Sequence, residues 1–402
     1  MRSRRSLEIA FTLGTAALAG CGSSPSGVDP DASNGTDGAG GGDAPTDGHD
    51  HNPPPGWYMG GEPDPIPSNF DTSQFIGTRP LQNAGAGGGE GAFRFICLAL
   101  GPDNQPILSY DDPIVYPGQT GAAHLHQFFG NTLTNANSTY ETLRTTGDGT
   151  CQGEAINRTA YWIPALLDGT GNVVVPNHVI IYYKGEDPNL TQLPRGLRYI
   201  AGDPAFGNLT NDEAYGSPNG GVLGGWEGIE DWRCESGGPA SLTIPTNCAV
   251  GTNILARVPF PHCWDGTNLD SPNHRTHVVH AKRDNNTGQS SCPATHPKIL
   301  PRFTIQVSYS ILAGDDVTKW RLSSDNHGGV QHEPGSTLHA DWFGAWDDQI
   351  MTTWTQKCLR EVRNGNDADY CDGTGGKWPR WNWLWGGQHP TPRVPVPPDP
   401  TP

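Results

Sequence analysis

Two histidines separated by one residue, His124 and His126, stand in the stretch DPIVYPGQTGAAHLHQFFGN. In a β-strand, side chains two positions apart lie on one face, about 6.6 Å apart along the strand. The two imidazoles can therefore converge on one ion or on one substrate, and neutral imidazole is a favoured ligand of Zn, Cu, Fe and Ni. Two ligands hold a metal weakly, so the pair needs further donors from elsewhere in the chain.

A second pair with the same spacing, His339 and Asp341, lies beside aromatic residues in GSTLHADWFGAWD. Its carboxylate can ligate a metal directly or orient an imidazole, as in metal sites and in acid–base catalysis. We expect this pair to meet His124 and His126 in one centre. The sequence leaves open whether the histidines bind a metal, act as acid and base, or only form structural hydrogen bonds.

A third group of histidines occurs in NHRTHVVH, where His274, His277 and His280 follow one another at steps of three. A strand over residues 275–281 would place His277 on the face opposite to His280. We include His277 in the predicted catalytic centre.

Carboxylates offer a rival site in GGWEGIEDWRCES, where acids are flanked by Trp226 and Trp232. Glycosidases use two carboxyl groups about 5–9 Å apart, and the candidates are Glu227, Glu230, Asp231 and Glu235. A solvated acidic loop beside Cys234 is the favoured interpretation. The alternating tryptophans of KWPRWNWLWGG, Trp381, Trp383 and Trp385, are interpreted as core rather than as a sugar platform.

The N-terminus indicates export. MRSRRS is basic, a short apolar run follows over about residues 9–18, and the segment ends Leu18-Ala19-Gly20-Cys21. This pattern predicts a signal peptide, because a membrane span needs about 20 apolar residues. The last four residues look like a bacterial lipobox, so we expect lipidation of Cys21. Membrane contact would then occur only through this anchor, at the outer membrane or cell surface.

The remaining eight cysteines form an even set, which in an exported chain predicts disulfides. Eight cysteines allow 105 connectivities, and nearest-neighbour pairing is the hypothesis adopted here. The predicted pairs are Cys97–Cys151, Cys234–Cys248, Cys263–Cys292 and Cys358–Cys371.

Composition separates the chain into four predicted segments. Residues 1–20 are the signal peptide, 21–64 a disordered Gly/Asp/Pro tether, 65–390 a single domain and 391–402 a Pro-rich tail. Such a tether has too little apolar surface to fold. The formal net charge of −17 disfavours nucleic acid as a partner, because phosphate binding relies on clustered Lys and Arg.

Abundant Gly (54) and Pro (37) indicate short strands joined by turns. Strands are expected over residues 92–100, 159–167, 173–183, 275–281 and 303–312. One amphipathic helix is expected in WDDQIMTTWTQKCLREVRNG, with Asp347 as its N-cap. The predicted fold is therefore mainly β, a β-sandwich-like domain with long loops, disulfides and one helix near the C-terminus.

Four motifs occur in an order that resembles a secreted family of fungi and bacteria, the domain of unknown function nineteen-ninety-six. They are DPIVYPGQTGAAHLHQFFGN, VPFPHCWDGTNLDSPNHRTHVVH, CPATHPKILPRF and HADWFGAWDDQIMTTWTQKC. The resemblance covers about residues 93–371 and supplies no reaction. It implies that ten residues occupy the family's motif positions: His124, His126, Cys263, Trp264, Asp265, Gly266, His277, His296, His339 and Asp341.

The function expected from these residues is an extracellular enzyme that acts on a polysaccharide or other cell-wall polymer. Its predicted catalytic residues are His124, His126, His277, His339 and Asp341, and all of these except His277 are the predicted ligands if one divalent metal ion is the cofactor. Trp264, Asp265 and Trp342 are the predicted substrate-binding residues. Two alternatives remain open, a non-catalytic carbohydrate-binding or adhesion lipoprotein and a metal-binding surface protein.

Overall fold

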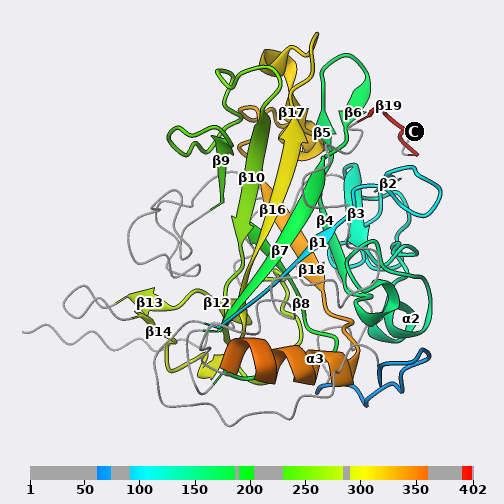
Figure 1. Ribbon diagram of the computed structural model, residues 1–402, viewed down its shortest axis with the longest axis vertical. Helices are drawn as coiled ribbons and strands as arrows, with labels where there is room; N and C mark the ends of the chain where they lie inside the picture. Colours follow the sequence, from blue (N-terminus) through cyan, green and yellow to red (C-terminus); the bar gives the residue numbers. More distant parts are fainter. Residues whose placement is uncertain are drawn as a thin grey trace, which may run out of the picture. The chain divides into compact units, whose positions relative to one another are not determined.

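Two antiparallel five-stranded sheets form the centre of the protein in a computed structural model (Figure 1). The structure describes residues 61–73, 91–185, 190–202, 230–283, 290–360 and 392–400, all within one unit that spans residues 45–402. In spatial order, sheet A consists of β1 (Gly91–Cys97), β7 (His178–Gly185), β16 (Arg302–Ser310), β10 (Asn253–Pro259) and β9 (Asp231–Cys234). Sheet B consists of β2 (Ile107–Ser109), β3 (His126–Gly130), β4 (Ala160–Pro164), β18 (His339–Phe343) and β8 (Arg198–Gly202).

The two sheets face each other across one core. Alternate residues of sheet A point into it, for example Phe93 and Phe95 on β1, as expected for strands with one buried face. Sheet B contributes Tyr161 and Trp342 to the same core, and the indole of Trp342 donates to the Tyr183 hydroxyl at 3.2 Å. The prediction of a mainly β, sandwich-like domain is therefore confirmed.

Smaller sheets extend the sandwich. One contains β17 (Arg321–Leu322), β5 (Leu166–Leu167), β6 (Asn172–Val174) and β19 (Arg393–Pro395). A second contains β12 (Val278–Val279), β11 (Cys263–Trp264) and β15 (Lys298–Ile299), and a third contains β13 (Lys282–Arg283) and β14 (Ser290–Ser291). Short 3-10 turns are η1 (Glu154–Ile156), η2 (Val317–Lys319) and η3 (Ser323–Gly329).

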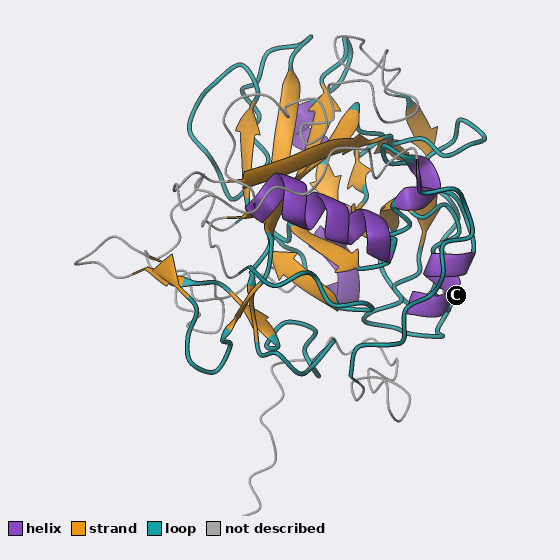
Figure 2. Ribbon diagram, turned by 60° about the horizontal axis from the view of Figure 1, so that its bottom comes forward, coloured by secondary structure: helices purple, strands orange, loops and turns teal. Residues whose placement is uncertain are grey.

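The predicted helix is α3 (Asp348–Trp354), which continues into the π-helical turn η4 (Thr355–Arg360) and lies across one end of the sandwich (Figure 2). The Asp347 side chain accepts from the amides of Gln349 and Ile350, so it caps the helix as expected. On its buried face, Trp354 stacks on Phe93 with 5.2 Å between ring centroids. A second short helix is α2 (Tyr140–Thr145).

Three of the four predicted disulfides are present, Cys97–Cys151, Cys234–Cys248 and Cys263–Cys292. Cys358 is also disulfide-bonded, and its predicted partner Cys371 lies outside the described residues. These bonds indicate an oxidising environment. Cys21, residues 22–60 of the predicted tether, and Trp381, Trp383 and Trp385 also lie outside the described part of the chain. Among the residues that are described, no helix is long and apolar enough to span a membrane.

The predicted strand over residues 275–281 is wrong for most of its length, since only Val278–Val279 is strand. The preceding residues form a turn, in which the Asn273 carboxamide oxygen accepts from the amides of Arg275 and Thr276 at 3.2 and 3.0 Å. His274 has a φ of 57°, a left-handed conformation that is incompatible with an extended strand.

Candidate metal centre

The outer face of sheet B, opposite to the core, carries both predicted pairs. Leu125 points into the core, so its neighbours His124 and His126 point outward. On β18, Trp342 faces the core, which places His339 and Asp341 on the outer face with the first pair. In both segments, the two-residue spacing therefore places the two side chains on the same face of the sheet, as the sequence predicted.

The register of the strands brings the two pairs together across β4. His126 pairs with Pro164, and extending the β4–β18 register by two residues places Pro164 opposite His339. The two histidines thus lie on strands separated by one strand, about 9.6 Å apart at the backbone. Their rings approach each other over the intervening proline, with 6.2 Å between centroids.

Three imidazoles form the cluster. The ring centroid of His124 lies 4.1 Å from that of His126 and 5.2 Å from that of His339. One nitrogen from each ring lies within 4.8 Å of one nitrogen from each of the others. Two imidazoles bound to one tetrahedral ion at about 2.0–2.1 Å have centroids roughly 5 Å apart. The spacing of the rings therefore fits a shared ion.

Two backbone carbonyls determine which ring nitrogens face the cluster. Nδ1 of His126 lies 3.0 Å from the Asp111 carbonyl oxygen, and Nδ1 of His339 lies 2.8 Å from that of Thr337. A carbonyl only accepts hydrogen bonds, so each Nδ1 must carry the proton and each Nε2 keeps its lone pair. Backbone carbonyls orient metal-binding histidines in the same way.

Asp112 joins the cluster from the loop that precedes β3. One ligand atom each of Asp112, His126 and Asp341 lie within 4.8 Å of one another. His126 belongs to both groups, but its single free nitrogen can bind only one ion. The two groups therefore adjoin at His126, and together they bring three imidazoles and two carboxylates to one region. The Asp112 carboxylate also accepts from the amides of Ile114 and Val115 at 2.7 and 2.9 Å, which fixes the loop.

Burial sets the charge of these groups. It lowers the pKa of His124 and His126 well below the usual value, with neighbouring imidazoles adding to the effect, and it lowers that of His339 to about 3. Burial also raises the pKa of Asp112 to about 6, and burial followed by repulsion from Asp112 raises that of Asp341 well above its usual range. Without a bound cation the histidines are neutral, and protonation of the buried Asp341 is favoured.

Several polar atoms of the cluster have no hydrogen-bond partner among the described residues. They are Nε2 of His124, Nε2 of His126 and both carboxyl oxygens of Asp341. Buried polar groups in native proteins are nearly always paired. Four such atoms belong to side chains of the two groups that could hold a metal ion, and a cation there would give them partners.

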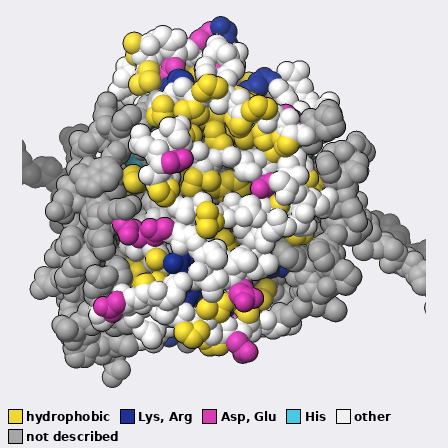
Figure 3. Space-filling model, turned by 90° about the vertical axis from the view of Figure 1, so that its right-hand side faces the viewer, with side chains coloured by type: hydrophobic (Ala, Val, Ile, Leu, Met, Phe, Trp, Pro, Cys, Tyr) yellow, Lys and Arg dark blue, Asp and Glu magenta, His cyan; other side chains and the backbone are white. Residues whose placement is uncertain are grey.

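Histidine side chains are scarcely visible on the face that carries α2 and β2, where hydrophobic side chains, proline included, form a band (Figure 3). His126, His339 and Asp341 are at most 3% exposed, whereas His124 is half-buried. The cluster therefore meets solvent on the His124 side.

The structure does not bring His277 into the cluster. Its Nδ1 lies 2.9 Å from the Ser271 hydroxyl and its Nε2 lies 3.0 Å from the Arg198 carbonyl oxygen. Both ring nitrogens are thus used within the fold, and residues 275–277, predicted as the start of a strand, belong to a turn instead. A structural role accounts for this histidine.

The predicted substrate-binding residues have internal partners. The Trp264 indole, 9% exposed, donates to the Asn268 carbonyl. The Asp265 carboxylate accepts from the amides of Thr267 and Asn268, and so fixes the same turn. Trp342 is 1% exposed and faces the core. These positions make turn formation and core packing the roles that account for the three residues.

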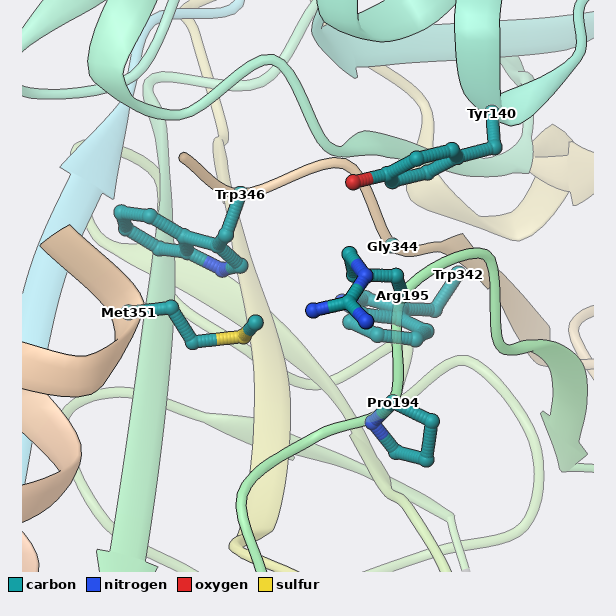
Figure 4. Close-up of a pocket in the computed structure, with 7 residues that line it drawn as sticks. All are labelled: Tyr140, Pro194, Arg195, Trp342, Gly344, Trp346 and Met351. Atoms are coloured by element: carbon teal, nitrogen blue, oxygen red, sulfur yellow. The ribbon is translucent and has the colours of Figure 1, made fainter. Parts of the chain in front are cut away.

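A small pocket lies near the C-terminal end of β18, beside Trp342. Figure 4 shows the Tyr140 hydroxyl and the Arg195 guanidinium pointing into it from different segments. The lining is completed by Pro194, Trp342, Gly344, Trp346 and Met351. None of the residues that line the pocket belongs to the histidine cluster.

The rival acidic site is only partly described. Asp231 lies on β9, 1% exposed, and pairs with the guanidinium groups of Arg233 and Arg257. The Glu235 carboxylate accepts from the Asn253 carboxamide, and Trp226 and Glu227 lie outside the described residues. Asp231 is therefore an ion-pair residue of the sheet.

Two residues beside the three clustered histidines, Asp112 and His327, could not be assigned to this site from the sequence. Asp112 opens the first motif but has no partner at a ligand-like spacing. His327 stands alone in the polar stretch SSDNHGG, and its ring centroid lies 5.4 Å from that of His124. Only the folding of loops over sheet B brings these residues to the cluster.

Comparison with protein families gives a match to Domain of unknown function (DUF1996) over residues 112–346. The match covers more than half of the chain, and the chain belongs to this family. It begins at Asp112 and includes every donor of the cluster. Comparisons with curated proteins and with solved structures gave no match.

Proposed function

We propose that this DUF1996-family chain is an exported metal-binding protein whose centre holds one divalent transition-metal ion. The observation that carries the proposal is the convergence of His124, His126 and His339 at the spacing of a shared ion. Asp112 and Asp341 supply carboxylates that balance the charge of the cation. Imidazole favours Zn, Cu, Ni and Fe, whereas Mg and Ca prefer oxygen-only sites.

A bound metal ion would offset the energetic cost of burying these polar groups. It would pair the free lone pairs of the imidazoles and would stabilise the charged form of Asp341, whose burial otherwise opposes ionisation. Ligands must be deprotonated before they bind, and the histidines are already neutral. Their Nδ1 contacts with backbone carbonyls hold them in the tautomer that binding requires.

Metal content and affinity test this proposal. The mature chain should be made without an affinity tag and with His49→Ala and His51→Ala, since this tether pair can bind metal adventitiously. We expect one equivalent of Zn²⁺ or Cu²⁺ per chain, and a loss of affinity on the order of 100-fold in His126→Ala and in His339→Ala. His178→Ala, in sheet A, is the control and should bind normally. Equal metal uptake by all variants would contradict the proposal.

Catalysis on a polysaccharide at the same centre is the second candidate. Two observations favour it, the half-buried position of His124 and the uncommitted carboxyl of Asp341 beside the imidazoles. A metal-bound water and a nearby carboxylate are the usual components of metal-assisted hydrolysis. Metal-dependent release of sugars by the parent chain, abolished in His126→Ala, would establish this activity; binding without release would favour an adhesion role.

We also propose that the chain is anchored to the outer membrane or cell surface through a lipid on Cys21. The support is the Leu-Ala-Gly-Cys sequence after a basic and apolar leader, together with the disulfides of the body. Membrane fractionation of cells that express Cys21→Ser tests it. A variant that stays in the membrane fraction would contradict lipid anchoring.

A further inference from the structure

A fourth imidazole stands at the solvent side of the cluster. The ring centroid of His327 lies 5.4 Å from that of His124, in an edge-to-face arrangement. This value falls within the range of 4.1–6.2 Å between the other three rings, and is close to the roughly 5 Å of two imidazoles on one ion. The His327 charge also acts on His124, His126 and His339.

The segment that carries His327 is held at both ends beside the cluster. The buried Asp325 carboxylate accepts from the amides of Leu322 and Gly335 and from the Thr337 hydroxyl, all at 2.6–2.7 Å. The carbonyl of Thr337 orients the His339 ring. Asp325 thereby connects the position of His327 to that of an established member of the cluster.

The backbone at His327 combines this anchoring with freedom to adjust. His327 itself is extended, with φ −72° and ψ 149°, and interrupts the helical turns of η3. Gly328 and Gly329 follow with φ of 68° and 77°, a conformation that costs glycine little. The His327 side chain is half-buried, and the residues after it are exposed; ligation requires a rotation of its ring toward the other three imidazoles.

We propose that His327 is a further ligand of the centre, which closes the ion on its solvent side and makes the site nitrogen-rich. The inference rests on the proposed metal-binding function and deepens it. A set of four imidazoles selects ions with high affinity for nitrogen, Cu²⁺ above all in the usual order of stability, over Mg²⁺, Ca²⁺ and Mn²⁺. It also leaves Asp112 and Asp341 as inner, charge-balancing groups.

Co²⁺ and Cu²⁺ are the probes for this inference. Three chains should be compared in the His49→Ala, His51→Ala background: the parent chain, His327→Ala and His332→Ala. His332 is the matched control, because it lies in the same anchored segment and is also half-buried. The readouts are Cu²⁺ affinity by competition titration, the visible spectrum of bound Co²⁺, and the melting temperature of the metal-free chains.

We expect His327→Ala to keep one site per chain, to lose affinity on the order of 10-fold or more, and to change the Co²⁺ spectrum. His332→Ala should match the parent chain, and both variants should melt within a few degrees of it. Parent-like affinity and spectrum in His327→Ala would overturn the inference while leaving the proposed function intact. Failure of the parent chain itself to bind metal would overturn the proposed function.

Discussion

Asp341 is the residue whose burial most needs compensation. Its carboxyl is fully buried on β18, neither oxygen has a hydrogen-bond partner in the described structure, and Asp112 is close enough to repel its charge. An uncompensated buried carboxylate destabilises a protein by several kcal/mol, so protonation is favoured in the metal-free chain. A cation beside it reverses this balance.

The substitution Asp341→Asn tests whether this carboxyl is neutral in the metal-free chain and charged when a cation is bound. Asparagine has the shape of the neutral carboxyl, so the metal-free variant should melt within a few degrees of the parent chain or higher. Metal affinity should fall on the order of 10- to 100-fold, because the compensating negative charge is absent. Thermal scans with and without Zn²⁺ measure both effects, and Asp265→Asn, in an exposed turn, is the control. A much less stable metal-free variant with unchanged affinity would show that Asp341 is ionised for structural reasons.

At the scale of residues, the sequence was sufficient to predict that His124, His126, His339 and Asp341 lie close together. Residues that can bind a metal recurred in it at the two-residue spacing of a strand, beside aromatic residues. The sequence did not predict that Asp112 belongs to the same site, because its proximity to Asp341 depends on how residues 110–123 fold over sheet B. It also could not separate His277, whose residue type matches the centre but whose ring nitrogens are used inside a turn.

At the scale of elements, successive side chains of β18 face alternately the candidate metal centre and the hydrophobic core. His339, Asp341 and Phe343 share the outer face, while Ala340 and Trp342 face sheet A. The predicted strand over residues 303–312 was a long apolar run and is confirmed as β16, because such a pattern depends little on the rest of the fold. The run over residues 159–167 divides into β4 and β5, and the run over residues 173–183 divides into β6 and β7. Short strands such as β3 and β8 depend on their neighbours and gave no independent signal.

Gly202, at the end of β8, allows the backbone of Leu338 and His339 to approach closely. It pairs with His339 and has a φ of 88°, and a Cβ at this position would lie 2.4 Å from the Leu338 carbonyl oxygen. A contact this short cannot be relieved by a side-chain movement, because the atom belongs to the backbone. The position of His339 therefore requires glycine at its cross-strand neighbour.

Gly202→Ala should therefore lower both stability and metal affinity. We expect a loss of about 2–4 kcal/mol, which combines conformational strain with displacement of β18. Gly171→Ala is the matched control, because Gly171 also has a positive φ, 97°, but open space around it; its loss should be about 1 kcal/mol, with normal affinity. Urea unfolding and Zn²⁺ titration of both variants test this, and equal effects would contradict the steric argument.

At the scale of the whole molecule, segments from both ends of the described chain pack onto the body. Within the predicted C-terminal tail, β19 pairs with β6, and the Pro397 carbonyl accepts from Tyr110 at 3.0 Å. Tyr110 and Gly121 belong to the loop that carries Asp112, and Pro400 packs against Gly121. Composition correctly indicated a proline-rich segment, but only the folded chain shows that part of it supports the loop of the centre.

Acid should destabilise the whole molecule through histidines outside the cluster. Burial lowers the pKa of His262 to about 3, with the charges of His280 and Arg302 adding to the effect, and burial lowers that of His277 and His280 to about 4. The unfolded chain titrates near 6.5, so between these values it binds more protons than the folded chain. The free energy of unfolding must then fall as the pH falls below 6.5.

The size of this effect can be bounded. Each such histidine contributes up to about 1.4 kcal/mol per pH unit between pH 6.5 and its folded pKa. Asp112, Asp341 and Asp348 work in the opposite sense, because burial raises the pKa of each carboxyl and so favours proton uptake by the folded chain. These three histidines and the three of the cluster act in the same direction and together outnumber the three carboxyls. Stability should therefore be highest near neutral pH and decrease steeply between pH 6 and pH 4.

Urea unfolding of the metal-free chain at pH 7, 6 and 5, with a chelator present, measures this slope. Replacing His262 with Gln removes one titrating group, and the slope between pH 6 and pH 5 should then decrease by about 1 kcal/mol per pH unit. A parent chain equally stable at pH 7 and pH 5 would mean that these buried histidines are solvated or already protonated in the fold.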